Sequence, residues 1–223
     1  MDAGEKLRIL VVVGRFPAIS SPFILNQITG LIDMGHDVSI FAMHVVDQGI
    51  EHNEIEKYKL REKLYVLDNT GSSRGSKFRY VVTKAISLLL NRPAVMLRAV
   101  KGFLTGRYPL SLKFFRQLNS VASIADTSFD IIHAQFGPQG NMMVMLRDAG
   151  ALSGKLVTQF RGFDVSLMTQ SEGEDYYHSL FESGDLFLPV CEYIKDKVIL
   201  LGAPENRTLV QYSGIDLNKF EYK

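Results

Sequence analysis

The sequence predicts an α/β domain built on a doubly wound parallel sheet. Short apolar runs rich in β-branched residues alternate with longer segments of helical periodicity along most of the 223 residues. The runs are apolar on both faces, as strands covered by helices on two sides must be. A hydrophobic content of 46% is ample for one large core. Together these observations predict a Rossmann-like fold.

Each element has its own pattern. Residues 9–13 are five consecutive apolar residues, and residues 37–42 alternate as a strand does. Phe23, Ile24 and Ile28 have helical spacing, and Gly35 ends that helix. By the same criteria the predicted strands are 9–13, 37–42, 63–67, 130–133, 155–160, 185–190 and 207–212. The predicted helices are 22–34, 139–149, 192–201 and a long stretch from 77 to 125 that Pro93 and Pro109 interrupt.

Composition and missing motifs narrow the function. The single cysteine, Cys191, allows no internal disulfide and indicates a reducing compartment. The start of the chain does not resemble a signal peptide, and no apolar run is long enough to span a membrane. The sequence has no dinucleotide-binding glycine motif, phosphate loop or hydrolase elbow, and its five histidines lack metal-ligand spacing. We therefore expect no cofactor or metal, and the net charge of +1 gives no case for nucleic acid.

Candidate binding residues follow the predicted strands, because open parallel sheets bind ligands beyond the carboxyl ends of their strands. Several have structural alternatives: Gly14 as a tight turn, Ser21 as a helix cap, His133 as a buried core histidine, and Arg161 with Asp164 as an ion pair that fixes a loop. The full candidate set is Gly14, Arg15, Phe16, Ser20, Ser21, His133, Gln135, Gly137, Arg161, Gly162 and Asp164.

Three stretches in order resemble retaining glycosyltransferases of family four, of the kind that build bacterial exopolysaccharide or lipopolysaccharide. They are residues 15–38, which open Arg-Phe-Pro and close Gly-His-Asp-Val; residues 132–165, with Ile-His-Ala-Gln-Phe-Gly and Thr-Gln-Phe-Arg-Gly-Phe-Asp; and residues 190–220, with Gly-Ile-Asp near the end. Three positions depart from the family pattern: Pro22 replaces a glutamate, and Gln135 and Arg161 each replace a histidine. Arginine stays protonated and cannot act as a base, so we expect Arg161 to hold an anionic group of the acceptor or of the transferring complex.

The resemblance implies the N-terminal half of a two-domain GT-B fold. That half, residues 1–223 here, would bind the saccharide acceptor, and residues 213–223 would begin the linker to a donor half that binds the nucleotide sugar. On this interpretation the chain alone is a fragment that transfers no sugar, and the intact enzyme is a hexosyltransferase. Two alternatives stay open: a non-catalytic sugar- or lipid-binding module, and one half of a GT-B-like epimerase or phosphorylase.

A basic segment interrupts the fold. Residues 71–125 hold ten basic residues and no acidic one, whereas the rest of the chain has fifteen basic and twenty-four acidic residues. Apolar residues interleave at helical spacing, which predicts cationic amphipathic helices that dock on an anionic membrane. The alternative is that the apolar stripes pack on the sheet. Docking would place the protein on the inner face of the bacterial cytoplasmic membrane, beside a lipid-linked acceptor. The predicted docking residues are Arg74, Lys77, Arg79, Lys84, Arg92, Arg98, Lys101, Arg107, Lys113 and Arg116.

Overall fold

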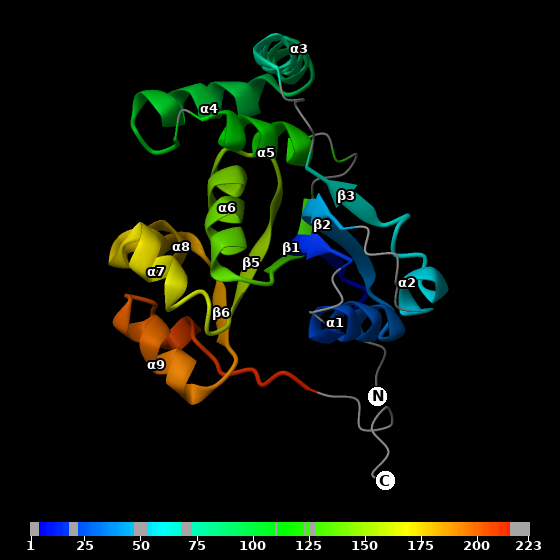
Figure 1. The fold of residues 1–223 in the computed structure, drawn as a ribbon, viewed down its shortest axis with the longest axis vertical. Helices are drawn as coiled ribbons and strands as arrows, with labels where there is room; N and C mark the ends of the chain where they lie inside the picture. Colours follow the sequence, from blue (N-terminus) through cyan, green and yellow to red (C-terminus); the bar gives the residue numbers. More distant parts are fainter. Residues whose placement is uncertain are drawn as a thin grey trace.

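A six-stranded, all-parallel sheet forms the centre of the molecule, with strand order β3-β2-β1-β4-β5-β6 (Figure 1). This is a computed structural model, and it describes residues 5–17, 22–46, 53–67, 73–109, 111–122, 124 and 128–214. The order confirms the doubly wound topology, because the chain moves outward from β1 to β3 and then returns to β4 on the other side. The strands are β1 (Arg8–Phe16), β2 (Asp37–Val45), β3 (Leu64–Val66), β4 (Ser128–Ala134), β5 (Ser153–Phe160) and β6 (Leu186–Pro189).

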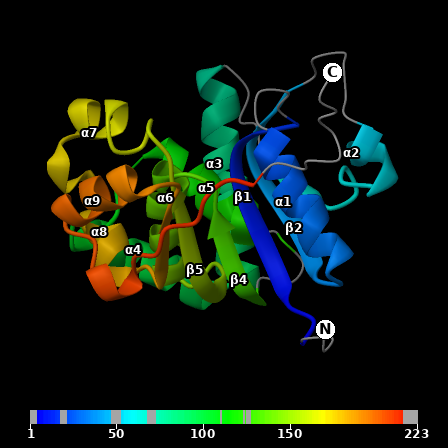
Figure 2. The same ribbon diagram turned by 90° about the horizontal axis from the view of Figure 1, so that it is seen from below.

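Helices cover both faces of the sheet (Figures 1 and 2). The basic segment forms three of them, α3 to α5, and they lie in the connection from β3 to β4. Proline begins α4 at its first position, as expected for a residue without a backbone N–H. The helices are α1 (Pro22–Asp33), α2 (Asn53–Lys57), α3 (Arg74–Asn91), α4 (Pro93–Leu104), α5 (Leu112–Ala122), α6 (Gly137–Asp148), α7 (Leu167–Glu172), α8 (His178–Ser183) and α9 (Glu192–Leu200).

The core has two layers because successive residues of a strand face opposite sides of the sheet. In β1, Val11 and Val13 pack with α1 residues, whereas Leu10 and Val12 belong to the cluster that contains residues of α5 and α6. All four side chains are fully or almost fully buried. This two-sided burial explains why the run from residue 9 to 13 is uniformly apolar.

The predicted seventh strand, residues 207–212, is wrong. A short 3-10 helix (Glu205–Arg207) occupies its start, and only an isolated bridge pairs Thr208 with Phe187. The segment still follows β6, because the N–H groups of Leu209 and Gln211 donate to Phe187 and Pro189. It then continues along the carboxyl edge of the sheet toward α1 (Figure 2).

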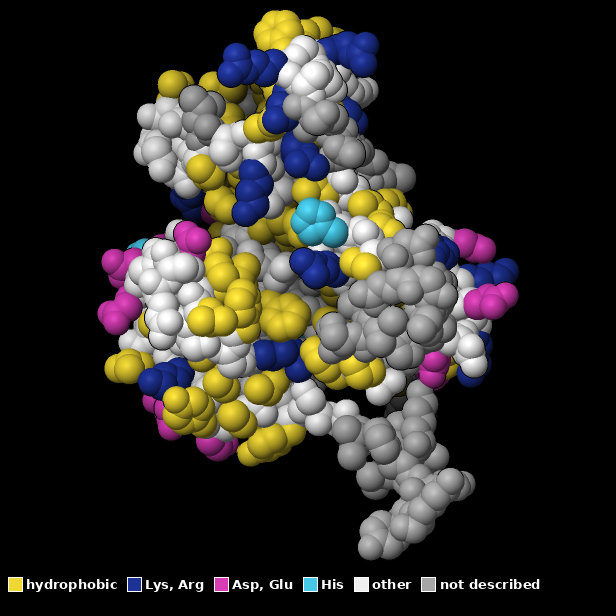
Figure 3. Space-filling model, in the orientation of Figure 1, with side chains coloured by type: hydrophobic (Ala, Val, Ile, Leu, Met, Phe, Trp, Pro, Cys, Tyr) yellow, Lys and Arg dark blue, Asp and Glu magenta, His cyan; other side chains and the backbone are white. Residues whose placement is uncertain are grey.

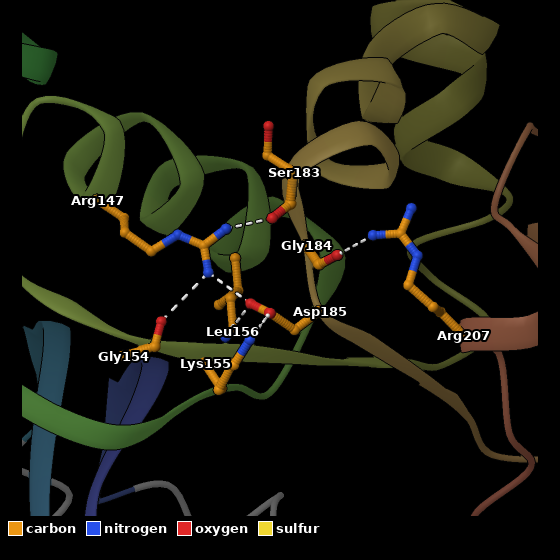
Figure 4. A network of polar contacts seen from close by, with 8 residues as sticks. All are labelled: Arg147, Gly154, Lys155, Leu156, Ser183, Gly184, Asp185 and Arg207. Atoms are coloured by element: carbon orange, nitrogen blue, oxygen red, sulfur yellow. Dashed lines mark hydrogen bonds and ion pairs between the residues drawn. The ribbon is translucent and has the colours of Figure 1, made fainter.

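A polar network around Asp185 fixes the start of β6 (Figure 4). Its carboxylate accepts from Arg147 Nη1 at 2.6 Å, from Lys155 Nζ at 3.0 Å and from the Leu156 N–H at 2.9 Å. Burial alone would raise the pKa of Asp185, but these hydrogen bonds and the Arg147 charge lower it below its ordinary value. Arg207 donates to the carbonyls of Gly184 and Phe181 beside this network. The network therefore joins α6, β5, α8 and the C-terminal segment.

Candidate functional site

The switch in strand order between β1 and β4 places two loops side by side at the carboxyl edge of the sheet. Val11 pairs with His133 and Val12 with Ala134, so the residues after β1 and β4 emerge next to one another. His133 also pairs with Val157 of β5, which brings the loop after β5 to the same edge. Open α/β sheets bind ligands at such a switch point. The topology thus gathers the three predicted segments into one region.

Buried polar atoms without a hydrogen-bond partner concentrate in this region. In the described part of the chain, eight such atoms occur, and every one belongs to β4, β5, the first turns of α6 or the loops that follow β4 and β5. Buried polar groups are normally paired, so a cluster of unpaired ones indicates a site prepared for ligand or water. The atoms are His133 Nε2, Gln135 Oε1, Gln139 Oε1, Asn141 Oδ1, Thr158 Oγ1, Gln159 Oε1, Arg161 Nε and Asp164 Oδ1.

Arg161 is the half-buried cation of the site. Its guanidinium carbon lies 3.9 Å from the ring centroid of Phe23 on α1 and 5.8 Å from that of Phe136 after β4. Nη1 donates to Ser213 Oγ at 2.9 Å. Cation–π contacts with the two rings and one hydroxyl contact hold the guanidinium without neutralising its charge. Burial lowers the pKa of Arg161, and the charge of Asp164 opposes that shift.

Asp164 organises the loop through the backbone. Its Oδ2 accepts the Arg161 N–H at 2.6 Å, and the Gly137 N–H at the start of α6 also donates to this carboxyl group. The Tyr177 hydroxyl donates to the Asp164 carbonyl at 3.0 Å. Burial raises the pKa of Asp164 to about 7, against the opposing effect of these N–H groups and of the Arg161 charge. The carboxylate therefore links the loop after β5 to α6, while the Arg161 guanidinium points to Ser213.

His133 is neutral at physiological pH. Its side chain is only 6% exposed, and burial lowers its pKa to about 4, with a further contribution from the nearby Arg161 charge. The sequence left two roles open, contact with a ligand or satisfaction inside the core. The structure buries His133 but leaves its Nε2 without a partner. It is thus a buried neutral histidine beneath the edge, with one ring nitrogen still available.

Three of the predicted site residues line two separate hollows. A polar pocket of about 280 Å³ is lined by Arg161, Gln159 and residues of α1 and the C-terminal segment. A larger hollow of about 690 Å³, which we call the insertion cleft, contains Gly14 and Arg15. It lies between the ends of β1 and β2 on one side and α5 and α6 on the other.

The remaining candidates have other positions. Phe16 is buried in the core beside α1, on the same side as Val11 and Val13, so the alternation of β1 does not continue to its last residue. Gly137 packs so closely on Tyr177 that an added Cβ would lie 2.6 Å from the ring. Gly162 is exposed with open space around it. Gln135 donates to Gln27 of α1 at 2.8 Å. Ser20 and Ser21 lie outside the described residues.

Sequence reasoning missed the polar side chains of α6 and β5. Gln139 approaches Gly14 closely, since a Cβ on that glycine would lie 3.2 Å from the Gln139 amide nitrogen. Asn141 donates to the Tyr176 carbonyl at 2.7 Å and keeps its Oδ1 unpaired. The available signal was a polar residue in each of the first turns of a helix that follows a strand end. Among the described residues, no group of three side chains suited to a metal ion was found.

The doubly wound sheet, with unpaired polar atoms at the carboxyl ends of its strands, defines the class: a Rossmann-like α/β domain with a candidate ligand-binding edge. The sequence profile of Glycosyltransferase Family 4 matches residues 21–219, and the chain belongs to that family. Over 212 residues the chain is 32% identical to WcaL of Salmonella typhimurium, which is named for colanic acid biosynthesis. It is 31% identical over 212 residues to AmsK of Erwinia amylovora, an amylovoran biosynthesis glycosyltransferase. Each match covers 94% of this chain and 51% of the relative. The chain therefore spans about half the length of these curated relatives.

Solved structures share the fold at low sequence identity. HepE from Anabaena, solved with UDP and glucose, superposes with a TM-score of 0.50 at 12% identity, covering 95% of this chain and 46% of HepE. The lipopolysaccharide outer core galactosyltransferase WaaB gives a TM-score of 0.50 at 11% identity over 92% of this chain and 45% of WaaB. These similarities confirm the expected GT-B type of domain.

Proposed function

We propose that this chain is the acceptor-binding half of a retaining glycosyltransferase that moves a sugar from a nucleotide sugar to a membrane-associated, lipid-linked saccharide. Its relatives are named for the biosynthesis of two extracellular polysaccharides, which supports a growing polysaccharide as the acceptor. The nucleotide sugar would be held mainly by a second domain, as the family resemblance implies. Alone, this half would not transfer sugar.

The observation that carries the proposal is the concentration of unpaired buried polar atoms at the strand ends. A sugar ring offers hydroxyl groups that both donate and accept, and such groups match amide oxygens, a threonine hydroxyl and an imidazole nitrogen. Burial keeps His133 neutral, so its unpartnered Nε2 accepts a hydroxyl hydrogen in one ring tautomer and donates its own hydrogen in the other. Arg161 would place a fixed positive charge beside the reacting groups, where charge on the departing nucleotide diphosphate develops.

The outer surface of the basic segment supports membrane docking. Leu88 is the one buried residue among those of α3, whereas Phe78, Leu90, Leu97 and Leu104 are each more than 70% exposed on α3 and α4. Lys and Arg side chains surround apolar ones on this part of the surface (Figure 3). Exposed apolar side chains among cations suit the headgroup boundary of an anionic bilayer. Among the described residues, no helix is long and apolar enough to cross a membrane.

The ten predicted docking residues do not act alike in the structure. Arg92 donates to the Ala151 carbonyl at 3.2 Å, and Arg107 pairs with Asp148 at 2.5 Å. Lys113 and Arg116 line the insertion cleft together with Arg107. The proposed docking surface therefore consists of the six cations on α3 and α4, which are Arg74, Lys77, Arg79, Lys84, Arg98 and Lys101.

Vesicle flotation tests the docking surface. We expect the chain to float with vesicles of phosphatidylcholine and phosphatidylglycerol and to stay behind with phosphatidylcholine alone. Reversing two charges on α3, Lys77→Glu with Arg79→Glu, should weaken anionic-vesicle binding about tenfold or more, since each basic residue contributes roughly 1 kcal/mol. Lys195→Glu with Lys197→Glu on α9 makes the same charge change elsewhere and should not matter. Equal recovery with both vesicle types would exclude the docking role.

A transfer assay tests the enzymatic proposal. The natural gene product that contains this chain is incubated with a panel of labelled nucleotide sugars and lipid-linked oligosaccharides extracted from membranes. We expect label in the lipid fraction with one donor, and a product whose anomeric configuration by NMR equals that of the donor. Inverted configuration would refute the retaining mechanism. Absence of transfer with every donor would refute the glycosyltransferase assignment itself.

A further inference from the structure

The insertion cleft joins two parts of the molecule that the sequence places far apart. One wall is formed by the ends of β1 and β2, through Gly14, Arg15 and His44. The opposite wall is formed by α5 and the segment before it. At about 690 Å³ the cleft has room for a disaccharide-sized group. Part of the basic segment is therefore a wall of the binding region and does not belong to the outer docking surface.

Positive charge gathers around this cleft. Its lining includes four cations, Arg15, Arg107, Lys113 and Arg116, and no aspartate or glutamate among the described residues. Arg107 is engaged by Asp148, with Nη2 to Oδ2 at 2.5 Å. Arg15 and Lys113 are exposed and have no ion-pair partner in the described ranges. Like charges around a concave surface repel one another, and an anion bound between them relieves that repulsion. Figure 3 shows Lys and Arg side chains above and below the hollow.

The floor of the cleft has a different chemistry. Met43, Phe114 and Met142 provide an apolar surface, and methionine adapts readily to ligands of irregular shape. Next to them, Gln139 and Asn141 each have a buried side-chain oxygen without a hydrogen-bond partner. A hydroxyl group is a suitable donor to such an oxygen. The cleft thus combines a cationic rim, an apolar floor and acceptors for sugar hydroxyls. A neutral sugar would leave the rim without a counter-charge.

We propose that the insertion cleft binds an acidic saccharide acceptor, with Arg15 and Lys113 holding a phosphate or carboxylate group and Gln139 and Asn141 accepting sugar hydroxyls. This inference rests on the proposed function and specifies the class of its acceptor. Two sources share the required oxyanion: the diphosphate that joins a saccharide to its lipid, and the carboxylate of an acidic sugar. Both can form charge-assisted hydrogen bonds with arginine and lysine.

Calorimetric titration of the chain tests the inference with two acidic ligands and their neutral counterparts. One pair is glucose linked through diphosphate to a short prenyl chain, with octyl glucoside as the neutral member. The other is a disaccharide that ends in glucuronate, with the same disaccharide ending in glucose. We expect at least one acidic ligand to bind more tightly than its counterpart. Arg15→Ala with Lys113→Ala should weaken that binding about tenfold or more, because both charge-assisted contacts with the oxyanion are lost.

Matched controls make the result decisive. Lys195→Ala with Lys197→Ala on α9 also removes two positive charges and should leave binding unchanged. Circular dichroism and an unchanged affinity for the neutral ligand establish that the cleft variant is folded. The acidic ligand that binds identifies the source of the oxyanion. If neither acidic ligand binds better than its neutral counterpart, or if the cleft variant binds as well as the wild type, the inference is overturned.

The transfer assay separates this inference from the proposed function. A gene product that transfers sugar to neutral acceptors alone would leave the proposed function standing and overturn the acidic-acceptor inference. A chain that binds an acidic ligand through Arg15 and Lys113, from a gene product that transfers no sugar, would support the cleft and refute the enzymatic assignment.

Discussion

Replacing His133 with glutamine should remove a large part of the acid sensitivity of the fold. The pKa of His133 is lowered to about 4 in the folded chain and is about 6.5 when the chain unfolds. A group with a lowered folded pKa contributes stability that is present above the unfolded pKa and is lost as pH falls. At about pH 4.5 the unfolded state binds the proton almost fully and the folded state only in part. The resulting loss is roughly 2 to 3 kcal/mol relative to about pH 8.

The assay is urea unfolding of wild type and His133→Gln at about pH 8 and about pH 4.5. Carboxyl groups, including that of Asp164, contribute to the pH dependence of both proteins, so the difference between the two pH dependences isolates His133. We expect the wild type to lose roughly 2 to 3 kcal/mol more than the variant. His178→Gln on α8 is the control, because it makes the same substitution at an exposed histidine. Equal pH dependences of the wild type and His133→Gln would refute the buried, neutral histidine.

Three further predictions follow from other contacts. Gly140→Ala should destabilise the fold by about 1–3 kcal/mol in urea unfolding, because its Cβ would lie 2.6 Å from buried Thr158 Oγ1. Gly30→Ala on α1, with nothing within 4 Å, should stabilise it by up to about 1 kcal/mol, and equal effects would contradict the packing argument. Asp185→Asn should cost about 1–3 kcal/mol at neutral pH but less in acid, where the wild-type carboxylate is protonated; a cost independent of pH would count against the ion pairs. Arg161→Ala should lower kcat/KM of the gene product about tenfold or more, and unchanged acceptor KM and turnover would exclude any role for its charge.

The sheet was predictable because most of its strands are short apolar runs that can be recognised in the sequence. A parallel strand buried on both faces must be apolar throughout, and six of the seven predicted strands have this form or a clear alternation and are confirmed. Residues 207–212 contain β-branched and aromatic residues as strands do, but a strand also needs a partner along its length, and among these residues only Thr208 forms a bridge. The elements α7 and α8 were missed because each has only six residues, too few for a helical period to show.

The site was predictable in place but not in detail. The crevice rule located the loops after β1, β4 and β5, since topology alone decides that their ends meet. It could not foresee that Phe16 would face the core while Arg15 faces the cleft, because the facing of a strand is set by its partners. The crevice rule also could not predict the contact between Arg161 and Ser213, which lies 52 residues further along the chain. Such contacts depend on the course of the C-terminal segment, which local sequence does not encode.

The position of α3, α4 and α5 in the chain has an evolutionary consequence. They occupy one crossover, which leaves the edge strand β3 and returns past β2 and β1 to β4. Lengthening or exchanging a crossover breaks no ladder between strands, and the entropy of closing it grows only slowly with length. These three helices can thus vary while the sheet beneath them stays constant. Related sequences can therefore differ in these helices without any change in the order or pairing of the strands.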